Sequence, residues 1–132
     1  SYLPEGSFSY PLVTHSDNRG SFTEFIRTPE RGQVSVNVSK PGITKGNHWH
    51  HTKNEKFLVV SGSGMIRFRR IGNEKVFEYK VSGDKPEVVD IPTGYTHSLV
   101  NTGDTALVTI MWVNECFDPE NPDTYYLEVD KQ

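Results

Sequence analysis

The sequence predicts an all-β domain, and three observations lead to that prediction. Apolar and polar residues alternate over short runs, which is the pattern of strands with one face buried. Clusters of Gly, Pro, Asn, Asp and Ser separate these runs, as turns between strands do. No segment has the periodicity of a helix of ten or more residues. Many short strands with Gly-rich turns are typical of a sandwich, a jelly roll or a barrel.

Gln33–Ser39 is the clearest predicted strand, because Val34, Val36 and Val38 fall on one face of an extended segment. Other strands are predicted from runs rich in β-branched or aromatic residues. They cover about 21–27, 55–60, 64–70, 75–81, 87–91, 97–100 and 107–113, with an edge strand at Tyr125–Val129. The predicted turns lie at Pro41-Gly42, Ser61–Gly64, Ile71–Asn73, Ser82–Asp84 and Asn101–Asp104.

The length of 132 residues fits one domain, since a typical domain has roughly 100 to 150 residues. We expect residues 1–20 to form an N-terminal segment leading into a barrel, residues 21–117 to form the barrel, and residues 118–132 to form a turn-rich tail.

Composition excludes some classes of function. The net charge is -3 and no long basic run is present, which argues against binding to nucleic acid. No apolar run reaches the roughly 20 residues that span a bilayer, and no signal-peptide pattern opens the chain. The single Cys116 fits a reducing compartment. We therefore expect a cytoplasmic protein that does not bind membranes.

A cluster of His and Glu residues predicts a metal site. On a strand, His48 and His50 point to one side and His51 to the other, so only the first two can share an ion. The polar stretch 51–54 is predicted as a turn that brings Glu55 back on the neighbouring strand, close enough for the same ion. His97 follows a Pro-x-Gly turn and completes the set. Three imidazoles and a carboxylate suit zinc, iron, nickel, copper or manganese.

These residues match the two cupin motifs, and the chain is therefore identified as a cupin, a double-stranded β-helix or jelly-roll barrel. The pattern Gly-x5-His-x-His-x4-Glu-x6-Gly is filled by Gly42, His48, His50, Glu55 and Gly62. The pattern Pro-x-Gly-x2-His-x3-Asn is filled by Pro92, Gly94, His97 and Asn101. The leading Gly of the second motif is absent, because Pro86 stands in its place. A cupin fold alone does not define a reaction.

Further segments resemble deoxysugar-nucleotide 3,5-epimerases. Asp17–Glu24 looks like their substrate-binding Asp-x-Arg-Gly-x-Phe-x-Glu segment, which implies substrate contacts for Arg19, Phe22 and Glu24. Lys45–His48 looks like their Arg-Gly-x-His, in which the His is the proton-abstracting base. One nitrogen cannot hold a metal and accept a proton, so we interpret His48 as a ligand because the other three ligands are present.

Most of the chain, Arg19–Val129, resembles the C-terminal cupin domain of CapF-type bifunctional capsular polysaccharide biosynthesis enzymes. The runs Lys40–Val60 and Thr109–Glu115 carry that likeness. The resemblance implies Zn²⁺ as cofactor, with another divalent transition metal as the alternative. It implies epimerisation at C3 of a UDP-linked 4-keto-6-deoxy-N-acetylhexosamine, and an N-terminal reductase domain in the full-length protein. We also expect a homodimer.

The catalytic groups are less defined. Lys56, Tyr95, His51 and a metal-bound water are the candidates for base and acid, since the 3,5-epimerases place a Tyr acid on a strand that here contains none. Arg19, Arg67 and Arg69 are candidates for the phosphates, the last two sharing a strand face.

Three other functions are compatible with the sequence. A cupin dioxygenase can use the same ligands with iron, nickel or copper. A non-catalytic sugar-nucleotide-binding cupin would bind substrate without exchanging a proton. A 3,4-ketoisomerase would move the carbonyl.

Overall fold

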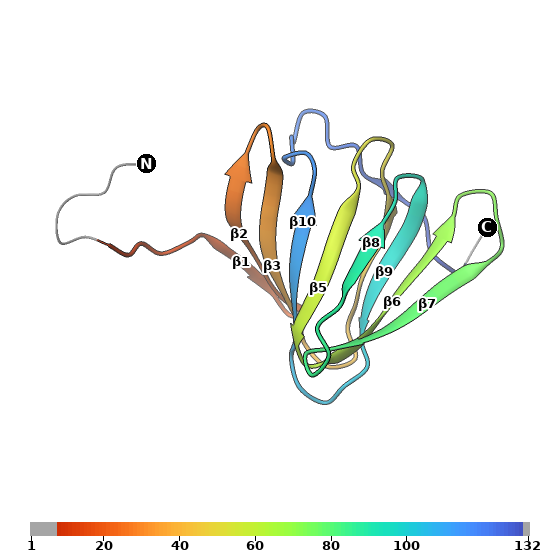
Figure 1. Cartoon of the computed structure of the whole chain (residues 1–132), viewed down its shortest axis with the longest axis horizontal. Helices are drawn as coiled ribbons and strands as arrows, with labels where there is room; N and C mark the ends of the chain where they lie inside the picture. The colour runs from red at the N-terminus through yellow and green to blue at the C-terminus, as the bar shows by residue number, and fades with distance from the viewer. Residues whose placement is uncertain (1–7, 131–132) are drawn as a thin grey trace.

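Two antiparallel sheets face each other in the structure (Figure 1). The computed structural model describes residues 8–130, so residues 1–7 of the predicted N-terminal segment and 131–132 of the predicted tail lie outside the described residues. The strands are β1 (Thr14–Asp17), β2 (Gly20–Thr28), β3 (Gly32–Ser39), β4 (Thr44–Trp49), β5 (Glu55–Ser61), β6 (Ser63–Arg70), β7 (Val76–Ser82), β8 (Val88–Ile91), β9 (Tyr95–Asn101), β10 (Leu107–Val113) and β11 (Tyr125–Tyr126). No helix in this part of the chain is long and apolar enough to cross a membrane. The all-β prediction is confirmed.

The chain passes repeatedly between the sheets. One sheet has the order β1-β2-β3-β10-β5-β8 and the other β11-β4-β9-β6-β7. From β3 to β6 and again from β7 to β11, each strand lies in the sheet opposite to the one before it. This alternation is what a jelly roll requires. Its consequence for the site is that β4 and β5, which are adjacent in sequence, face each other across the interior.

The apolar core fills the space between the sheets next to the predicted metal ligands. It consists of Phe57, Val59, Ile66, Phe68, Val81, Val89, Ile91, Leu99 and Leu107. Along β5 the inward positions run from Glu55 to Phe57 and Val59, and along β9 they run from His97 to Leu99. The polar site therefore lies on a packed apolar floor, which gives its side chains little freedom to move.

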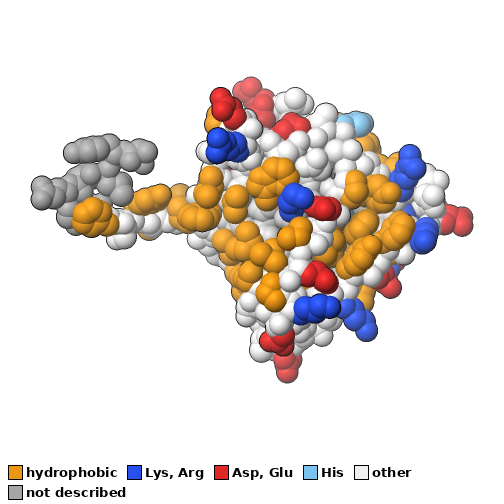
Figure 2. Space-filling model, viewed as in Figure 1, with side chains coloured by type: hydrophobic (Ala, Val, Ile, Leu, Met, Phe, Trp, Pro, Cys, Tyr) orange, Lys and Arg blue, Asp and Glu red, His pale blue; other side chains and the backbone are white. Residues whose placement is uncertain are grey.

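Strand β3 has an unusual distribution of polarity. Its buried side chains are Gln33, Ser35, Asn37 and Ser39, whereas its valines are only partly buried and point away from the interior. Register shows that these valines belong to a wider apolar surface, because Val36 pairs with Ile110, which pairs with Leu58. We call this surface the outer face, and it comprises Val34, Val36, Val38, Leu58, Val60, Val88, Val108, Ile110 and Trp112. Figure 2 shows apolar side chains gathered over these strands.

Residues 118–130 of the predicted turn-rich tail bond to the five-stranded sheet, and we call this segment the strap. The predicted edge strand Tyr125–Val129 is shorter than expected, because β11 pairs with β4 only at Tyr125 and Tyr126. Beyond it the strap bonds elsewhere, since the N–H groups of Leu127 and Val129 donate to the carbonyl and side-chain oxygens of Asn47 at 2.9 and 3.1 Å.

Candidate metal centre

A β-bulge in β4 turns His48 toward the interior. Thr44, Lys45 and Gly46 pair regularly with β9, but the register shifts at Asn47, and His48 then pairs with His97. Asn47 has a φ of 60°, and Gly46 a φ of 106°. A Cβ at Gly46 would lie 2.7 Å from the His97 carbonyl oxygen, so glycine is required there. Because the extra residue reverses the alternation of side chains, Lys45 and His48 both face the interior.

Glu55 reaches the cluster from the opposite sheet, which corrects the expectation of a neighbouring strand. β4 pairs with β9 and β11, whereas β5 pairs with β10 and β8. Residues 50–54 therefore cross from one sheet to the other and do not form a hairpin. His50 itself lies just beyond the last residue of β4. The ligands meet because the sheets face each other, with a shared interior between them.

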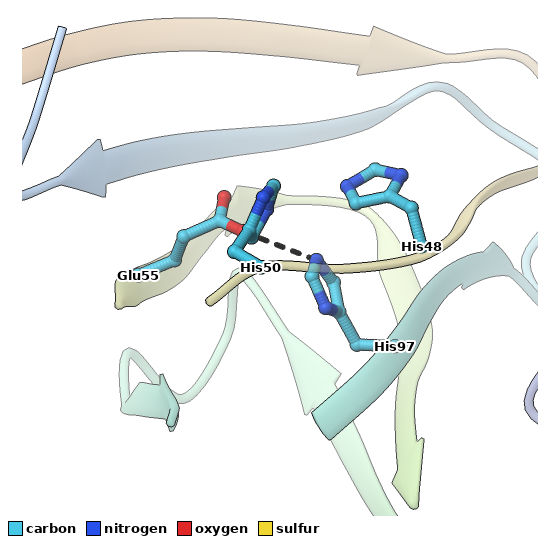
Figure 3. A group of neighbouring side chains, drawn as sticks. All are labelled: His48, His50, Glu55 and His97. Carbon is cyan, nitrogen blue, oxygen red and sulfur yellow. Dashed lines mark hydrogen bonds and ion pairs between the residues drawn. The ribbon is translucent and has the colours of Figure 1, made fainter. Parts of the chain in front are cut away.

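The four predicted ligands converge (Figure 3). One donor atom from each of His48, His50, Glu55 and His97 lies within 4.8 Å of the others. Two donors on one zinc ion are at most about 4.2 Å apart, so small side-chain shifts bring this set to bonding distance. The Glu55 carboxylate accepts a hydrogen bond from His50 Nε2 at 2.9 Å and lies 3.2 Å from His97 Nε2. The predicted cluster is confirmed as a group that can hold a metal.

The charges of the cluster suit a cation. Burial, reinforced by the neighbouring His97, lowers the pKa of His48 to about 4, so this ring is neutral at pH 7. Burial alone would raise the pKa of Glu55, but His50 and His97 hold that pKa well below its usual range. Burial alone would also lower the pKa of His50, yet its contacts with Glu55 and the Asp123 carbonyl raise it. An ionised carboxylate beside the neutral ring of His48 offers two of the donors that a transition metal requires.

One atom of the cluster has no satisfying partner. His97 Nε2 is buried, and its contact with Glu55 does not have hydrogen-bonding geometry. A buried nitrogen without a hydrogen-bonding partner destabilises the folded state, because it has lost its hydrogen bond to water and gained none in return. A metal ion between the four donors would satisfy this nitrogen, so the residues present fit such an ion.

The cluster opens into a cavity of about 500 Å³. Lys45 lines this cavity, and its Nζ donates to Asn37 Oδ1 at 2.8 Å and to the Val38 carbonyl at 3.1 Å. Burial, and then the charge of Arg19, lower the pKa of Lys45. Arg19 also lines the cavity and is bonded to Asp17 at 3.0 Å. The cavity therefore joins the candidate metal site to two basic groups.

Other predicted site residues lie in different places. Phe22 lines the cavity with Arg19, whereas Glu24 does not. Lys56 is exposed on the outer face, 2.6 Å from Asp90, because it follows Glu55 and points the opposite way. His51 packs its exposed ring against Trp49 and Tyr125. Tyr95 packs on Phe68 in the core.

The two strand arginines bind the strap, and neither lines the cavity. Arg67 pairs with Glu78 at 2.8 Å and with Asp130 at 2.7 Å. Arg69 is only 1% exposed and donates to the carbonyls of Val129, Glu128 and Asn73. They share a face, as the alternation predicted, but that face is the one covered by the strap.

Two residues of the site were missed by sequence reasoning. The sequence did contain an indication for Lys45, which occupies the Arg position of the Arg-Gly-x-His resemblance, but the bulge in β4 was not predicted. The sequence contained no indication for Asp123, because it lies more than 70 residues from the residues that it contacts. Its carboxylate accepts hydrogen bonds from the His51 and Thr52 N–H groups, both at 3.0 Å. These bonds outweigh burial and hold the pKa of Asp123 at about 2.

The chain belongs to a family of polysaccharide biosynthesis domains. The polysaccharide biosynthesis C-terminal domain family matches residues 15–125. The chain is 46% identical over 129 residues to a UDP-2-acetamido-2,6-beta-L-arabino-hexul-4-ose reductase of Pseudomonas aeruginosa, covering 98% of this chain and 35% of that protein.

Solved structures with a similar fold include a protein of capsular polysaccharide assembly. The crystal structure of the capsular polysaccharide assembling protein CapF from Staphylococcus aureus is 73% identical, with a TM-score of 0.93 over 97% of this chain and 37% of that chain. The predicted resemblance to CapF is confirmed. The Drosophila melanogaster CENP-C cupin domain, 19% identical, has a TM-score of 0.64 over 76% of this chain and 73% of its own, which supports the cupin fold alone.

We predict one tightly bound transition metal per chain. Glu55→Ala or His97→Ala should reduce the metal content of the purified protein at least tenfold, because each removes a ligand and leaves the remaining donors poorly arranged. Glu78→Ala, which removes an exposed carboxylate, is the matched control. Elemental analysis measures the result, and full occupancy in both ligand variants would contradict the site.

Proposed function

Because the chain belongs to the polysaccharide biosynthesis C-terminal domain family, we propose that it epimerises C3 of a UDP-linked 4-keto-6-deoxy-N-acetylhexosamine with the help of a bound metal. One observation carries the proposal: the cluster of three His and one Glu opens into the same cavity as Lys45 and Arg19. The name of the Pseudomonas aeruginosa relative adds support, because it describes a UDP-linked 2-acetamido sugar with its carbonyl at C4.

Epimerisation beside a ketone requires a stabilised enolate. A proton at C3 is acidic only if the charge that develops on the C4 oxygen is stabilised. Zn²⁺ held by His48, His50, Glu55 and His97 would supply that stabilisation as a Lewis acid. The packed floor formed by Phe57 and Leu99 would limit the water that reaches the reacting carbons.

Lys45 is the group best placed to receive the C3 proton. It lines the cavity, and its lowered pKa increases the neutral fraction that can act as a base at physiological pH. Asn37 and Val38 occupy two of its hydrogen-bonding positions and leave one for a substrate. The C3 proton would pass to Lys45 Nζ, and inversion would follow when a proton returns to the opposite face of C3.

Arg19 is suited to the diphosphate of the nucleotide. Its guanidinium lies at the cavity, half exposed, and its bonds to Asp17 hold it in one orientation. An arginine fixed in this way binds phosphate oxygens with little further loss of freedom. The nucleotide would then lie across the mouth of the cavity, with the sugar directed toward the metal cluster.

The full-length protein is proposed to contain a second activity. The chain spans 37% of CapF and 35% of the Pseudomonas aeruginosa reductase. We propose that an N-terminal reductase domain acts on the epimerised ketone. The Pseudomonas aeruginosa relative is named as a reductase, and this chain matches only 35% of it, which leaves room for a separate reductase domain in the rest. A cytoplasmic location agrees with the free thiol of Cys116.

A homodimer through the outer face is proposed as the functional assembly. The apolar row Val36, Ile110 and Leu58 crosses the middle of the face, and an apolar surface of this kind is typical of an interface. The ion pair of Lys56 with Asp90 on this face suits a second copy of the chain, because a two-fold axis can place each charge near its opposite.

The reaction should be visible without any hydride donor. In heavy water with the UDP-4-keto sugar and no NADPH, the chain should place deuterium at C3 and leave the C4 ketone intact, because epimerisation exchanges only a proton. NMR and mass spectrometry measure the exchange, and the Glu55→Ala variant is the control. Binding without exchange would favour a non-catalytic module, oxygen consumption a dioxygenase, and a carbonyl at C3 a ketoisomerase.

Lys45→Met should reduce deuterium exchange at least 100-fold while leaving the metal content unchanged, since it removes the base and not a ligand. In the unaltered protein, the exchange rate should rise with pH as Lys45 loses its proton. Lys56→Met is the matched control and should retain full exchange. Equal exchange by the Lys45→Met variant would assign the base to another group.

Light scattering should give a dimer mass for the unaltered chain. Ile110→Lys should give a monomer with unchanged metal content, because it buries a charge in the proposed interface. Tyr126→Lys, an exposed aromatic on the other sheet, should leave the dimer intact. A monomeric unaltered chain would show that something other than a second copy covers the outer face.

A further inference from the structure

We propose that Asp123 in the C-terminal strap is a positioning residue of the metal centre: its carbonyl orients His50, and its carboxylate fixes the segment that carries His50 across to Glu55. The inference rests on the proposed metal role of the cluster. It concerns how this chain holds a ligand, and it is independent of which reaction follows.

The carbonyl contact holds Nδ1 of His50 and turns Nε2 toward the other members of the cluster; the Thr124 hydroxyl lies farther from Nδ1, at 3.4 Å. His50 Nδ1 lies 2.7 Å from the Asp123 carbonyl oxygen and donates to it, while Nε2 points at Glu55. A histidine that binds a metal through one nitrogen usually donates the N–H of the other to a carbonyl or carboxylate, which fixes the ring and its tautomer. His50 lies beyond the end of β4, so pairing within the sheet does not orient it.

The carboxylate contact fixes the crossing segment. Asp123 accepts from the N–H groups of His51 and Thr52 through different oxygens, and from Thr52 Oγ1 at 3.1 Å. These three bonds hold the first residues after His50. The other hydrogen bonds of this segment are those of Asn114 with Thr52 and Asn54, of the Gly94 N–H with the His50 carbonyl at 3.0 Å, and of Lys53 with the strap. None of them holds the N–H groups of His51 and Thr52.

The backbone at Asp123 is specialised for this contact. Its φ is 48°, in the left-handed region that non-glycine residues seldom adopt and that Asp and Asn tolerate best. The strap is held on both sides, since Lys53 Nζ donates to the Pro122 carbonyl and Tyr125 pairs with Trp49. Lys53 is itself buried, at 6% exposure. A strained conformation held from both sides delivers the carbonyl to His50 Nδ1.

Three substitutions separate the contributions of Asp123. Asp123→Gly removes the carboxylate without backbone strain, Asp123→Ala removes it and adds strain, and Asp123→Asn keeps an acceptor oxygen and the tolerance for positive φ. Asp130→Ala is the matched control, because Asp130 lies in the same strap and its carboxylate binds Arg67, which is not a member of the cluster. Thermal unfolding identifies any variant that fails to fold. If the Ala variant fails to fold, the Gly variant alone is compared with the unaltered chain.

The first measurement is Zn²⁺ affinity by competition with a chromophoric chelator. The Gly and Ala variants should bind Zn²⁺ about 10 to 100-fold more weakly, as is usual for loss of a partner that orients a ligand. The Asn variant should stay within a few-fold of the unaltered chain, and Asp130→Ala should be unchanged. Unchanged affinity in both the Gly and Ala variants would overturn the proposal, as would an equal loss in Asp130→Ala.

The second measurement needs neither metal nor substrate. Proton NMR of the metal-free chain, labelled with nitrogen-15, should show a His50 Nδ1 proton that exchanges slowly with water in the unaltered chain and the Asn variant, because it is held by the Asp123 carbonyl. In the Gly variant this proton should exchange at least tenfold faster. Equal exchange rates in the Gly variant and the unaltered chain would overturn the proposal. Absence of epimerase activity alongside these results would count against the proposed reaction alone.

Discussion

The buried carboxylate of Glu55 is the constraint on which the site depends. An ionised carboxylate between two packed sheets is stable only if donors or a cation compensate it. Those partners are His97 of the opposite sheet at 3.2 Å and His50, just past the end of β4, at 2.9 Å. The spacing of the two sheets, the bulge in β4 and the crossing segment 50–54 all serve to bring the imidazoles to this one charge.

The strap, near the end of the chain, restrains three parts of the structure around the site. It bonds to the bulge through Asn47, to the outer side of the five-stranded sheet through Arg69, and to the crossing segment through Asp123. A guanidinium as deeply buried as that of Arg69 requires acceptors, and the strap carbonyls supply them. The segment that looks like a tail in the sequence thus supports the strands that carry three of the four predicted ligands.

Much of the fold and the metal cluster could be predicted from local patterns. Alternation and turn residues located most strands, since both signals depend on residues close in sequence. The cupin spacings identified His48, His50, Glu55 and His97, because those spacings reflect the path of the chain between sheets. The phosphate roles expected of Arg67 and Arg69 were less secure, because alternation gives a shared face but does not say which face is covered.

The sequence by itself determined most of the strands, the types of the candidate ligands and the family likeness, because each is encoded in residues within a short span; β1 and β4 were not among the predicted strands. Only the tertiary structure decided that Glu55 comes from the facing sheet, that the valines of β3 point outward, and that Lys45 and not Lys56 lines the cavity. The reason is physical. A one-residue bulge or a crossing between sheets reverses the direction of every following side chain, and both are fixed by contacts with residues far away in the sequence.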